Sequence, residues 1–337
     1  MYPADLNVLV GKLETVPGTP ETNLVAADLD VRIFEPTFTP GTVMNGDIKY
    51  ATGDHSEHAD IAGAQIAQLA GNIHLNDAGA AGTKPNLSKF LESAGLKYFQ
   101  TVSKGVWWQP LKETDCNQTM TLWFVKVKCG PSPKAIAYKF GGAKANVVLS
   151  AGGVGQPWMA ALAFQAFKAA DPVEITDAST IAVLTGADTA VPHAFLNCDT
   201  TIGVKAITPA SFSLDSGNEV LAKFNPAKAS GVDQFYIATR KPRFSLNPLT
   251  EDVADYSPLA DMDAETLRKI TMVENAGISF SLTIAQAQVI SAALAAREGL
   301  NAFDLNYKCL RNGETGSPAV AGLPVECPWE FMIGSKT

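Results

Sequence analysis

Residues 134–167 read KAIAYKFGGAKANVVLSAGGVGQPWMAALAFQAF. Gly141 and Gly142 lie between two runs in which apolar and polar residues alternate, a pattern typical of a β-hairpin. A second glycine-rich break, 152–157, leads into another apolar run at 158–167. A similar stretch, ISFSLTIAQAQVISAALAAREGLNAFDLNYKCL, follows at 278–310. The two stretches predict a strand meander that occurs twice in the chain.

The composition limits the classes of function. The chain has 337 residues, of which 46% are hydrophobic and only 18% are charged. A low charged fraction is typical of a protein that buries surface against other copies, and equally of an ordinary β-rich domain. The formal net charge of −8 argues against a surface that grips nucleic acid, because such a surface needs clustered Lys and Arg. It leaves open a surface past which nucleic acid slides.

The cysteines and the apolar segments bear on the compartment. The cysteines are odd in number and widely scattered, which predicts reduced structural thiols: Cys116, Cys129, Cys198, Cys309 and Cys327. The N-terminal segment lacks the pattern of a signal peptide, and no apolar run approaches the length of a membrane-spanning helix. We therefore expect a protein that is assembled in the cytoplasm and does not associate with a membrane.

The first half is expected to form strands around one helix. Residues 27–39 alternate as in a half-buried strand, and 41–60 form a long polar loop. The helix is predicted over 83–96, where Pro85 suits the first turn and Gly95 the C-terminal end. Further strands are predicted at 61–75, 106–110, 119–128, 135–140, 145–151 and 157–167.

The second half repeats this order of elements. Its helix is predicted over 261–270 with Asp263 as the N-cap, and its closing strands over 278–282, 286–293 and 301–310. The segments 143–151 and 285–293 resemble each other loosely, which indicates an internal duplication. The fold class predicted is mainly β, with two antiparallel sandwich-like or barrel-like halves and one helix per half. The predicted boundaries are an arm at 1–25, a β domain at 26–172, a linker at 173–204 and a second β domain at 205–337.

No motif predicts catalysis or a bound cofactor. The loop segment 54–60 contains potential metal ligands, yet it has no helical period and no second ligand group, so a solvated loop or a contact loop is the better interpretation. The glycines at 152–157 form neither a dinucleotide fingerprint nor a P-loop. His74 and His193 are interpreted as structural histidines. Trp107, Trp108, Trp123 and Trp158 fall in strand runs and are interpreted as core or interface residues.

KLETVPGTPET at 12–22 and AADLDVRIFEPTFTP at 26–40 resemble the opening of the tail tube proteins of tailed bacteriophages, also called major tail proteins. The resemblance continues in order through AGAAGTKPNLSKFLESAGL at 78–96 and KANVVLSAGGVGQPWMAALAFQAFKAADP at 144–172. QFYIATRKPRFSL at 234–246 completes it. Each motif alone is weakly specific, so the shared order carries the resemblance.

The resemblance implies a virion protein that forms homo-oligomeric rings and stacks them into a hollow tail. DNA would pass through the lumen without specific binding, and the sheets of neighbouring subunits would join into one barrel. A duplicated chain would form trimers that mimic a hexamer, and an unduplicated chain would form hexamers. The other tail proteins expected as partners are the tape measure, the terminator and the distal tail protein.

The resemblance also assigns candidate residues. The candidate contact loop between rings contains Asp54, His55, Glu57, His58 and Asp60. The candidate strands of the tube wall contain Ala145, Val147, Leu149, Trp158, Phe164, Val289, Phe303 and Leu305. The alternative functions are another tail component, such as a terminator, baseplate or adaptor ring, and a carbohydrate-binding or hydrolytic β-sandwich, which would need a cleft with paired carboxylates.

Overall fold

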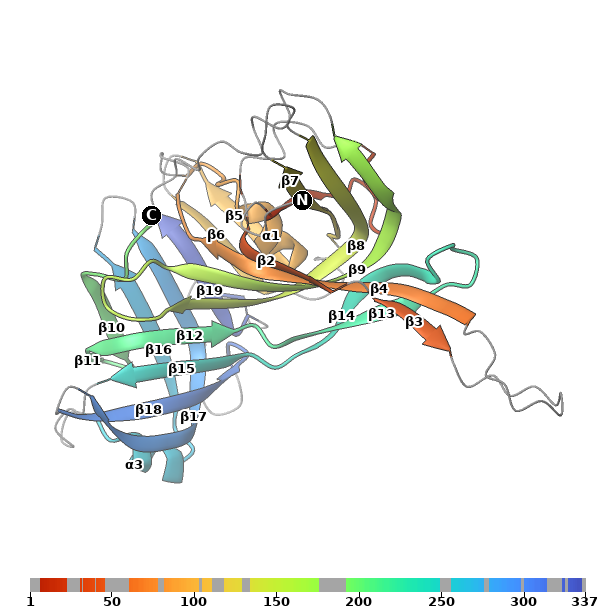
Figure 1. Cartoon of the computed structure of the whole chain (residues 1–337). Coiled ribbons are helices and arrows are strands. Elements are labelled where there is room, and N and C mark those ends of the chain that lie inside the picture. The colour runs from red at the N-terminus through yellow and green to blue at the C-terminus, as the bar shows by residue number, and fades with distance from the viewer. Residues whose placement is uncertain are drawn as a thin grey trace, which may run out of the picture.

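The computed structural model describes residues 7–22, 31, 33–39, 41–45, 61–77, 82–102, 105–110, 118–128, 134–175, 192–248, 256–275, 279–297, 300–313, 323–324 and 327–334. These residues form mainly antiparallel β-strands, with two short helices (Figure 1). The predicted mainly β fold class is therefore confirmed.

The elements follow one another in two sets. The first half contains β1 (Asn7–Leu13), β2 (Phe34–Thr39), β3 (Thr42–Asn45), β4 (Ile61–His74), α1 (Ser88–Ser93), β5 (Leu96–Thr101), β6 (Gly105–Pro110), β7 (Met120–Lys128), β8 (Lys134–Ala151) and β9 (Met159–Ile175). The second half contains β10 (Cys198–Ile202), β11 (Lys205–Ile207), β12 (Pro209–Asp215), β13 (Asn218–Phe224), β14 (Val232–Arg240), β15 (Arg243–Pro248), α3 (Pro258–Asp263), β16 (Leu267–Glu274), β17 (Phe280–Arg297), β18 (Leu300–Leu310) and β19 (Trp329–Gly334).

The strands of the first half close into a barrel. Its order is β1–β7–β8–β9–β4–β2, and every neighbouring pair is antiparallel. A bridge between Leu9 and Ile33 joins the start of β2 to β1, where the Ile33 N–H donates to the Leu9 carbonyl at 3.1 Å. Closure pairs backbone groups that an open sheet would leave exposed.

The second half closes into a barrel with the same pairing order. Its order is β10–β16–β17–β18–β15–β12. The circle is completed by β11, which pairs with β10 and leads directly into β12. Along the chain, α1 lies between β4 and β7, and α3 lies between the equivalent strands β15 and β16. The predicted duplication is therefore present in the strand pairing.

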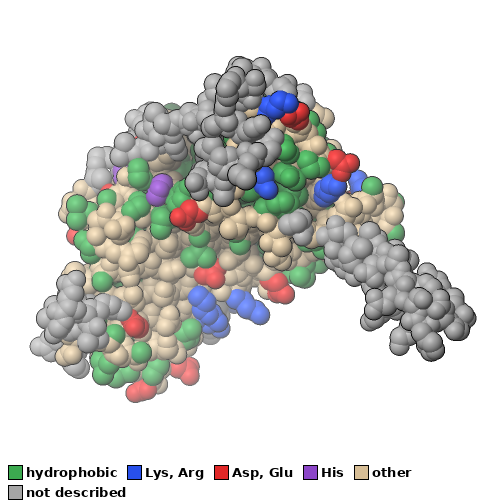
Figure 2. All heavy atoms as spheres, in the orientation of Figure 1, with side chains coloured by type: hydrophobic (Ala, Val, Ile, Leu, Met, Phe, Trp, Pro, Cys, Tyr) green, Lys and Arg blue, Asp and Glu red, His purple; other side chains and the backbone are tan. Residues whose placement is uncertain are grey.

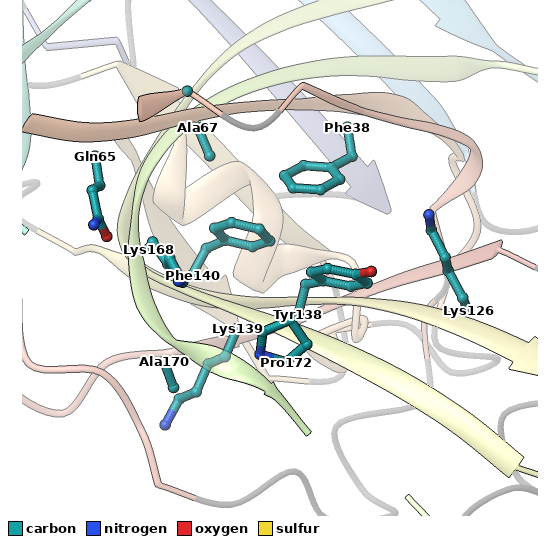
Figure 3. Close-up of a pocket in the computed structure, with 11 residues that line it drawn as sticks. Phe38, Gln65, Ala67, Lys126, Tyr138, Lys139, Phe140, Lys168, Ala170 and Pro172 are labelled. Atoms are coloured by element: carbon teal, nitrogen blue, oxygen red, sulfur yellow. The ribbon is translucent and has the colours of Figure 1, made fainter. Parts of the chain in front are cut away.

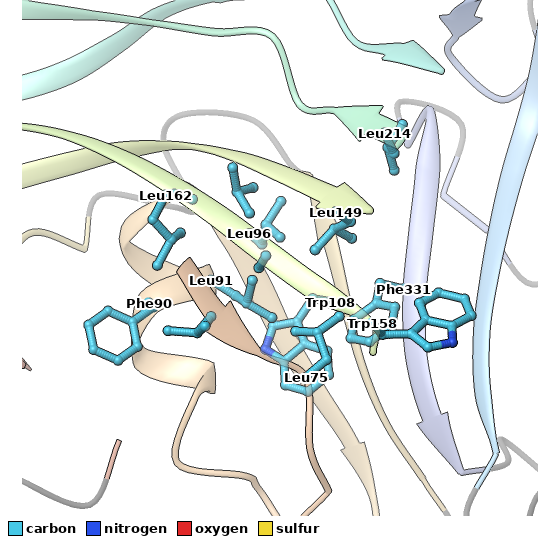
Figure 4. Close-up of a cluster of buried hydrophobic side chains, with 14 of the residues drawn as sticks. Leu75, Phe90, Leu91, Leu96, Trp108, Leu149, Trp158, Leu162, Leu214 and Phe331 are labelled. Carbon is cyan, nitrogen blue, oxygen red and sulfur yellow. The ribbon is translucent and has the colours of Figure 1, made fainter. Parts of the chain in front are cut away.

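One continuous hydrophobic core extends through both barrels. Trp158 is fully buried within it, and its ring centroid lies 4.7–6.4 Å from those of Phe195, Phe212, Phe280 and Phe331. Figure 4 shows Trp158 beside Phe331. Because these aromatic side chains come from both halves, separating the barrels would expose them to water.

The prediction that the chain turns at Gly141 and Gly142 to form a hairpin is wrong. The chain continues through both glycines as the single strand β8, and it reverses only between β8 and β9. The register between these strands shifts between Gly141 and Lys144, so the glycines mark a bulge. Gly142 has a φ of 63°, and a Cβ there would meet the Phe167 ring at 2.5 Å. The glycines are needed for a bulge and a close ring contact.

Both predicted helices are shorter than expected. α1 covers only Ser88–Ser93, followed by Gly95 with a φ of 77°, as the C-terminal glycine predicts. α3 ends at Asp263, and its N-cap is Ser257, whose Oγ accepts a hydrogen bond from the Ala260 N–H at 3.4 Å. Asp263 is thus not the N-cap. The residues after it form β16, in which Ile270 and Met272 alternate into the core as in a strand.

Parts of the predicted arm and linker are strands. Residues 7–13 form β1 of the first barrel, and 14–22 follow it on the same barrel. In the predicted linker, 173–175 complete β9 and 198–202 form β10, while 176–191 lie outside the described residues.

Candidate assembly surface

A sheet of eight antiparallel strands runs through both barrels. Its order is β2–β4–β9–β8–β12–β15–β18–β17. The two barrels join within it because one edge of β8 pairs with β7 up to Ala143 and then with β12 at residues 148–151. In Figure 1, β8 and β9, then β12, β15 and β18, follow one another down the front of the molecule.

The two sides of this sheet differ in chemistry. One side points into the core and carries large apolar residues such as Leu69, Phe164, Leu214, Phe244 and Tyr307. The opposite side, which we call the polar face, carries small and polar residues that are not buried. They are Glu35, Thr37, Thr39, Gln68, Ala70, Asn72, Asn146, Val148, Ser150, Ala161, Ala163, Gln165, Ser213, Asp215, Arg243, Ser245, Ser291, Ala293, Asp304, Asn306 and Lys308. Figure 2 shows this side as a largely tan surface with scattered charged groups.

Cross-strand pairing aligns the side chains of the polar face in rows. One row is formed by Ser150, Ser213, Ser245, Asn306 and Ser291, each paired with the next. A parallel row contains the charged residues Asp215, Arg243 and Lys308. With Asp304 and Glu35, the face has three acidic and two basic side chains, so it forms no cationic track for a phosphate backbone.

The junction between β8 and β12 is held by the side chain of Asn146. Its Nδ2 donates to Asp215 Oδ1 at 2.8 Å, and its Oδ1 accepts from Ser216 Oγ at 2.7 Å and from the Asn218 N–H at 2.8 Å. Asn146 lies where β8 leaves β7 and begins to pair with β12. This amide therefore stabilises the point at which the two barrels become one sheet.

We expect Asn146→Ala to lower the free energy of unfolding by about 2 kcal/mol, because three hydrogen bonds at a part-buried junction are lost. Chemical denaturation followed by tryptophan fluorescence would measure this. Asn306→Ala is the matched control, since its amide is exposed and donates to Ser291 Oγ on the same face. An equal loss in both variants would contradict a special role for Asn146.

A hairpin from the second half packs on the sheet of the first half. β13 and β14 pair with each other, and their residues Val220, Phe235 and Ile237 form a separate cluster with Phe167. The hairpin extends the β12–β15 pair beyond the second barrel, as β3 and the start of β4 extend the β2–β4 pair beyond the first. The two projecting hairpins are thus equivalent.

The predicted tube-wall residues lie in or next to this sheet, but mostly on its core side. Ala145, Val147, Leu149, Phe164, Val289 and Leu305 are buried, and Phe303 is partly buried against the core. Trp158 is buried just before β9. The residues of the predicted contact loop, Asp54, His55, Glu57, His58 and Asp60, lie outside the described residues. The polar face itself was not predicted, although alternation within each strand could have identified its members.

A cavity of about 490 Å³ opens beside the first barrel (Figure 3). Three aromatic rings line it, and the Phe38 centroid lies 5.6 Å from Tyr138 and 5.1 Å from Phe140. Lys126, Lys139 and Lys168 border it, and burial lowers the pKa of Lys139. None of its described lining residues is an acid, so it lacks the paired carboxylates that glycoside hydrolysis uses.

His193 is the centre of a polar cluster, as suits a structural histidine. Its Nε2 lies 2.9 Å from Asp77 Oδ2, its Nδ1 lies 3.2 Å from Glu274 Oε2, and its ring stacks on Phe280. Both nitrogens face carboxylate oxygens, so pairing of both requires an imidazolium or a protonated carboxyl. Burial raises the pKa of Glu274, and His193 opposes that shift. The cluster connects segments from both halves.

We expect His193→Ala to destabilise the protein by about 1–3 kcal/mol at pH 7 and by less at pH 5. Without the imidazole, burial acts on Glu274 with only the backbone hydrogen bond from Phe280 to oppose it, so the folded-state pKa of Glu274 rises further. A carboxyl with a raised pKa loses stability as the pH rises from the unfolded pKa through the folded one. Thermal unfolding at several pH values would measure the difference from the parent protein. A deficit that grows toward pH 5 would contradict the prediction.

No known family model matches the chain, and no curated protein matches it. Within the described residues, no helix is both long and apolar enough to cross a membrane.

Proposed function

We propose that this chain is the structural subunit of a bacteriophage tail tube, which self-assembles into stacked rings and forms the conduit for DNA ejection. The observation that carries the proposal is the eight-stranded sheet that crosses two equivalent barrels and presents one polar face. In this role the chain is a virion protein that needs neither catalytic residues nor a cofactor.

The polar face has the chemistry that the wall of a DNA channel requires. Its side chains are mostly small and uncharged, and its three acids, Glu35, Asp215 and Asp304, outnumber its two bases, Arg243 and Lys308. A wall without clustered cations offers the phosphate backbone few sites at which to bind, so DNA would slide along it. The net charge of the chain, −8, has the same consequence.

The duplication favours a trimer over a hexamer. Each barrel would occupy one of two equivalent positions in a ring, so that a trimer has the appearance of six units. Hexamers of the duplicated chain are the alternative. The mass of the intact ring, measured by native mass spectrometry, distinguishes the two.

The proposed contacts between stacked rings involve segments that project from the barrels. The β3–β4 hairpin flanks the segment 46–60, which contains the candidate contact loop and lies outside the described residues. The partners proposed beyond the chain itself are the tape measure, terminator and distal tail proteins.

Electron microscopy of the purified protein tests the proposal. We expect rings that stack into hollow tubes as the protein concentration increases. Rings that never stack would favour the alternative of a terminator, baseplate or adaptor ring. Dispersed monomers under all conditions of concentration, salt and pH would contradict self-assembly altogether.

A further inference from the structure

The eight-stranded sheet ends in two edges that have no partner strand among the described residues. At one end, β2 pairs with β4, and no described strand pairs with the other edge of residues 36–39. At the other end, β17 pairs with β18 as far as Arg297, whereas its opposite edge pairs with β16 only up to Gln288. Unpaired edges are sites at which another strand can add.

The chain contains an internal counterpart of these two edges. β8 is the equivalent of β17, and its edge pairs with β7 up to Ala143, as the edge of β17 pairs with β16 up to Gln288. Beyond that point β8 pairs with β12, which is the equivalent of β2. The joint between the two barrels thus shows how the end of one barrel unit pairs with the start of the next.

The strand registers of the two barrels establish which residues are equivalent. Ala143 and Gln288 are the last residues of equivalent pairings, so Leu149 corresponds to Leu294. The partners of these two leucines in the hairpins are then equivalent as well. Leu149 pairs with Ala160 and Leu294 pairs with Phe303, so Ala160 corresponds to Phe303 and, four residues further on, Phe164 corresponds to Tyr307. This register replaces the predicted correspondence of 143–151 with 285–293.

The same procedure relates β2 to β12. In the first barrel Phe164 pairs with Leu69, which pairs with Phe38. In the second barrel Tyr307 pairs with Phe244, which pairs with Leu214. Phe38 is therefore the equivalent of Leu214. The register shifts also occur in equivalent strand pairs. The pair β2–β4 has a shift, as does its equivalent β12–β15, and the pair β7–β8 has a shift, as does its equivalent β16–β17.

Exposure indicates that the β17 edge is an interface. Leu149 is 1% exposed in the internal joint, where it pairs with Leu214 of β12. Its equivalent Leu294 is 75% exposed, and Ile290 on the same strand is 47% exposed. A strand from outside the chain would cover Leu294 as β12 covers Leu149.

We propose that β17 of one copy pairs antiparallel with β2 of the next copy, with Phe38 opposite Leu294. In this register Thr37 lies opposite Ala295, and Thr39 lies opposite Ala293. The equivalent pairs in the internal joint are Ser213 with Ser150 and Asp215 with Val148. The contact is head-to-tail, the kind of contact that forms a ring when the rotation between successive copies closes. It also continues the polar face from copy to copy. The inference rests on the proposed self-assembly and specifies its contact.

Cysteine cross-linking tests the register. The variant Thr37→Cys/Ala295→Cys, treated with a short bismaleimide, is expected to give a covalent ladder between copies that stops at the ring size. Ser150→Cys/Ser213→Cys is the matched control, since the equivalent pair lies within one chain and should cross-link without a ladder. Thr37→Cys/Ser291→Cys is the off-register control and should give no ladder, because Ser291 lies about 13 Å along the strand from residue 295. The parent protein controls for its own thiols.

Substitution of the exposed leucine tests the same edge independently. We expect Leu294→Arg to raise the concentration needed for ring formation roughly a hundredfold, because the charge would be buried against the next copy. Its thermal unfolding as a monomer should be unchanged, because the side chain is exposed there. Val204→Arg is the control, since Val204 is 93% exposed in the turn between β10 and β11 and should assemble normally.

The outcomes separate the inference from the proposed function. Rings or tubes that form without the Thr37–Ala295 cross-link, or with equal cross-linking in the off-register variant, would overturn the β17–β2 contact and leave self-assembly standing. Normal ring formation by Leu294→Arg would have the same meaning. Failure of the parent protein to assemble under any condition would overturn the proposed function, and the inference with it.

Discussion

Glu14→Ala is expected to destabilise the protein by about 3–5 kcal/mol. Glu14 is 3% exposed, and its carboxylate accepts four hydrogen bonds. The donors are the backbone N–H groups of Gly18 and Gly142 and the hydroxyls of Thr119 and Thr121. Alanine would remove the acceptor of the Gly142 N–H and of both hydroxyls in a buried space, while the Gly18 N–H would keep Thr119 Oγ at 3.0 Å. Thermal and chemical unfolding would measure the loss.

Glu21→Ala is the matched control for Glu14. Glu21 lies on the same segment, but it is partly exposed. Its Oε1 accepts hydrogen bonds from the Thr15 N–H at 3.0 Å and the Thr15 hydroxyl at 2.8 Å, and its Oε2 lies 3.6 Å from Lys12 Nζ. Loss of an exposed interaction of this kind is expected to cost less than about 1 kcal/mol. Similar losses in both variants would show that the buried carboxylate does not organise the segment.

Trp158→Ala is the second substitution with a large expected effect, about 3–5 kcal/mol. Trp158 leads into β9 of the first barrel and is fully buried against Phe212 and Phe280 of the second, so its removal leaves a cavity at their junction. Because both barrels share this residue, we expect them to unfold together at a lower temperature. Calorimetry would show one transition displaced downward, and a separate transition for each barrel would contradict a shared core.

Trp158→Phe and Trp107→Ala are the controls for this position. Phenylalanine keeps an aromatic ring and removes an indole N–H that has no hydrogen-bond partner, so the loss should be smaller than for alanine. Trp107 is only partly buried and stacks on Phe99, so its truncation should cost about 1 kcal/mol. A loss for Trp107→Ala as large as for Trp158→Ala would argue against a central role for Trp158.

Alternation of apolar residues predicted most of the strands, because one side of each strand faces the core. β4 and β7 lie close to their predicted bounds, and the two meanders are the equivalent hairpins β8–β9 and β17–β18. The glycine pair at 141–142 was misjudged, because a bulge and a hairpin turn both favour glycine. The helix predicted at 261–270 was misjudged because Leu267 and Ile270 fit a helical spacing, whereas pairing with β17 makes them part of a strand.

The polar face was harder to predict from the sequence than the strands were. Alternation assigns Ser213 and Ser245 to one side of their strands, but it cannot say that they lie beside Ser150 and Asn306. The role of Glu14 was also missed, since its four donors come from segments far apart in the chain. His193 likewise acquires Asp77 and Glu274 as partners only through folding.

The amino-acid sequence by itself determined the mainly β class, the number of meanders and the low charge of the chain, because these follow from local alternation and composition. Only the tertiary structure decided that the halves have the same pairing order, that they share one core, and that one sheet crosses both. The physical reason is that strand register is set by hydrogen bonds between distant segments. The edges at β2 and β17 that no described strand covers, and the exposed side chain of Leu294 on β17, follow from that pairing.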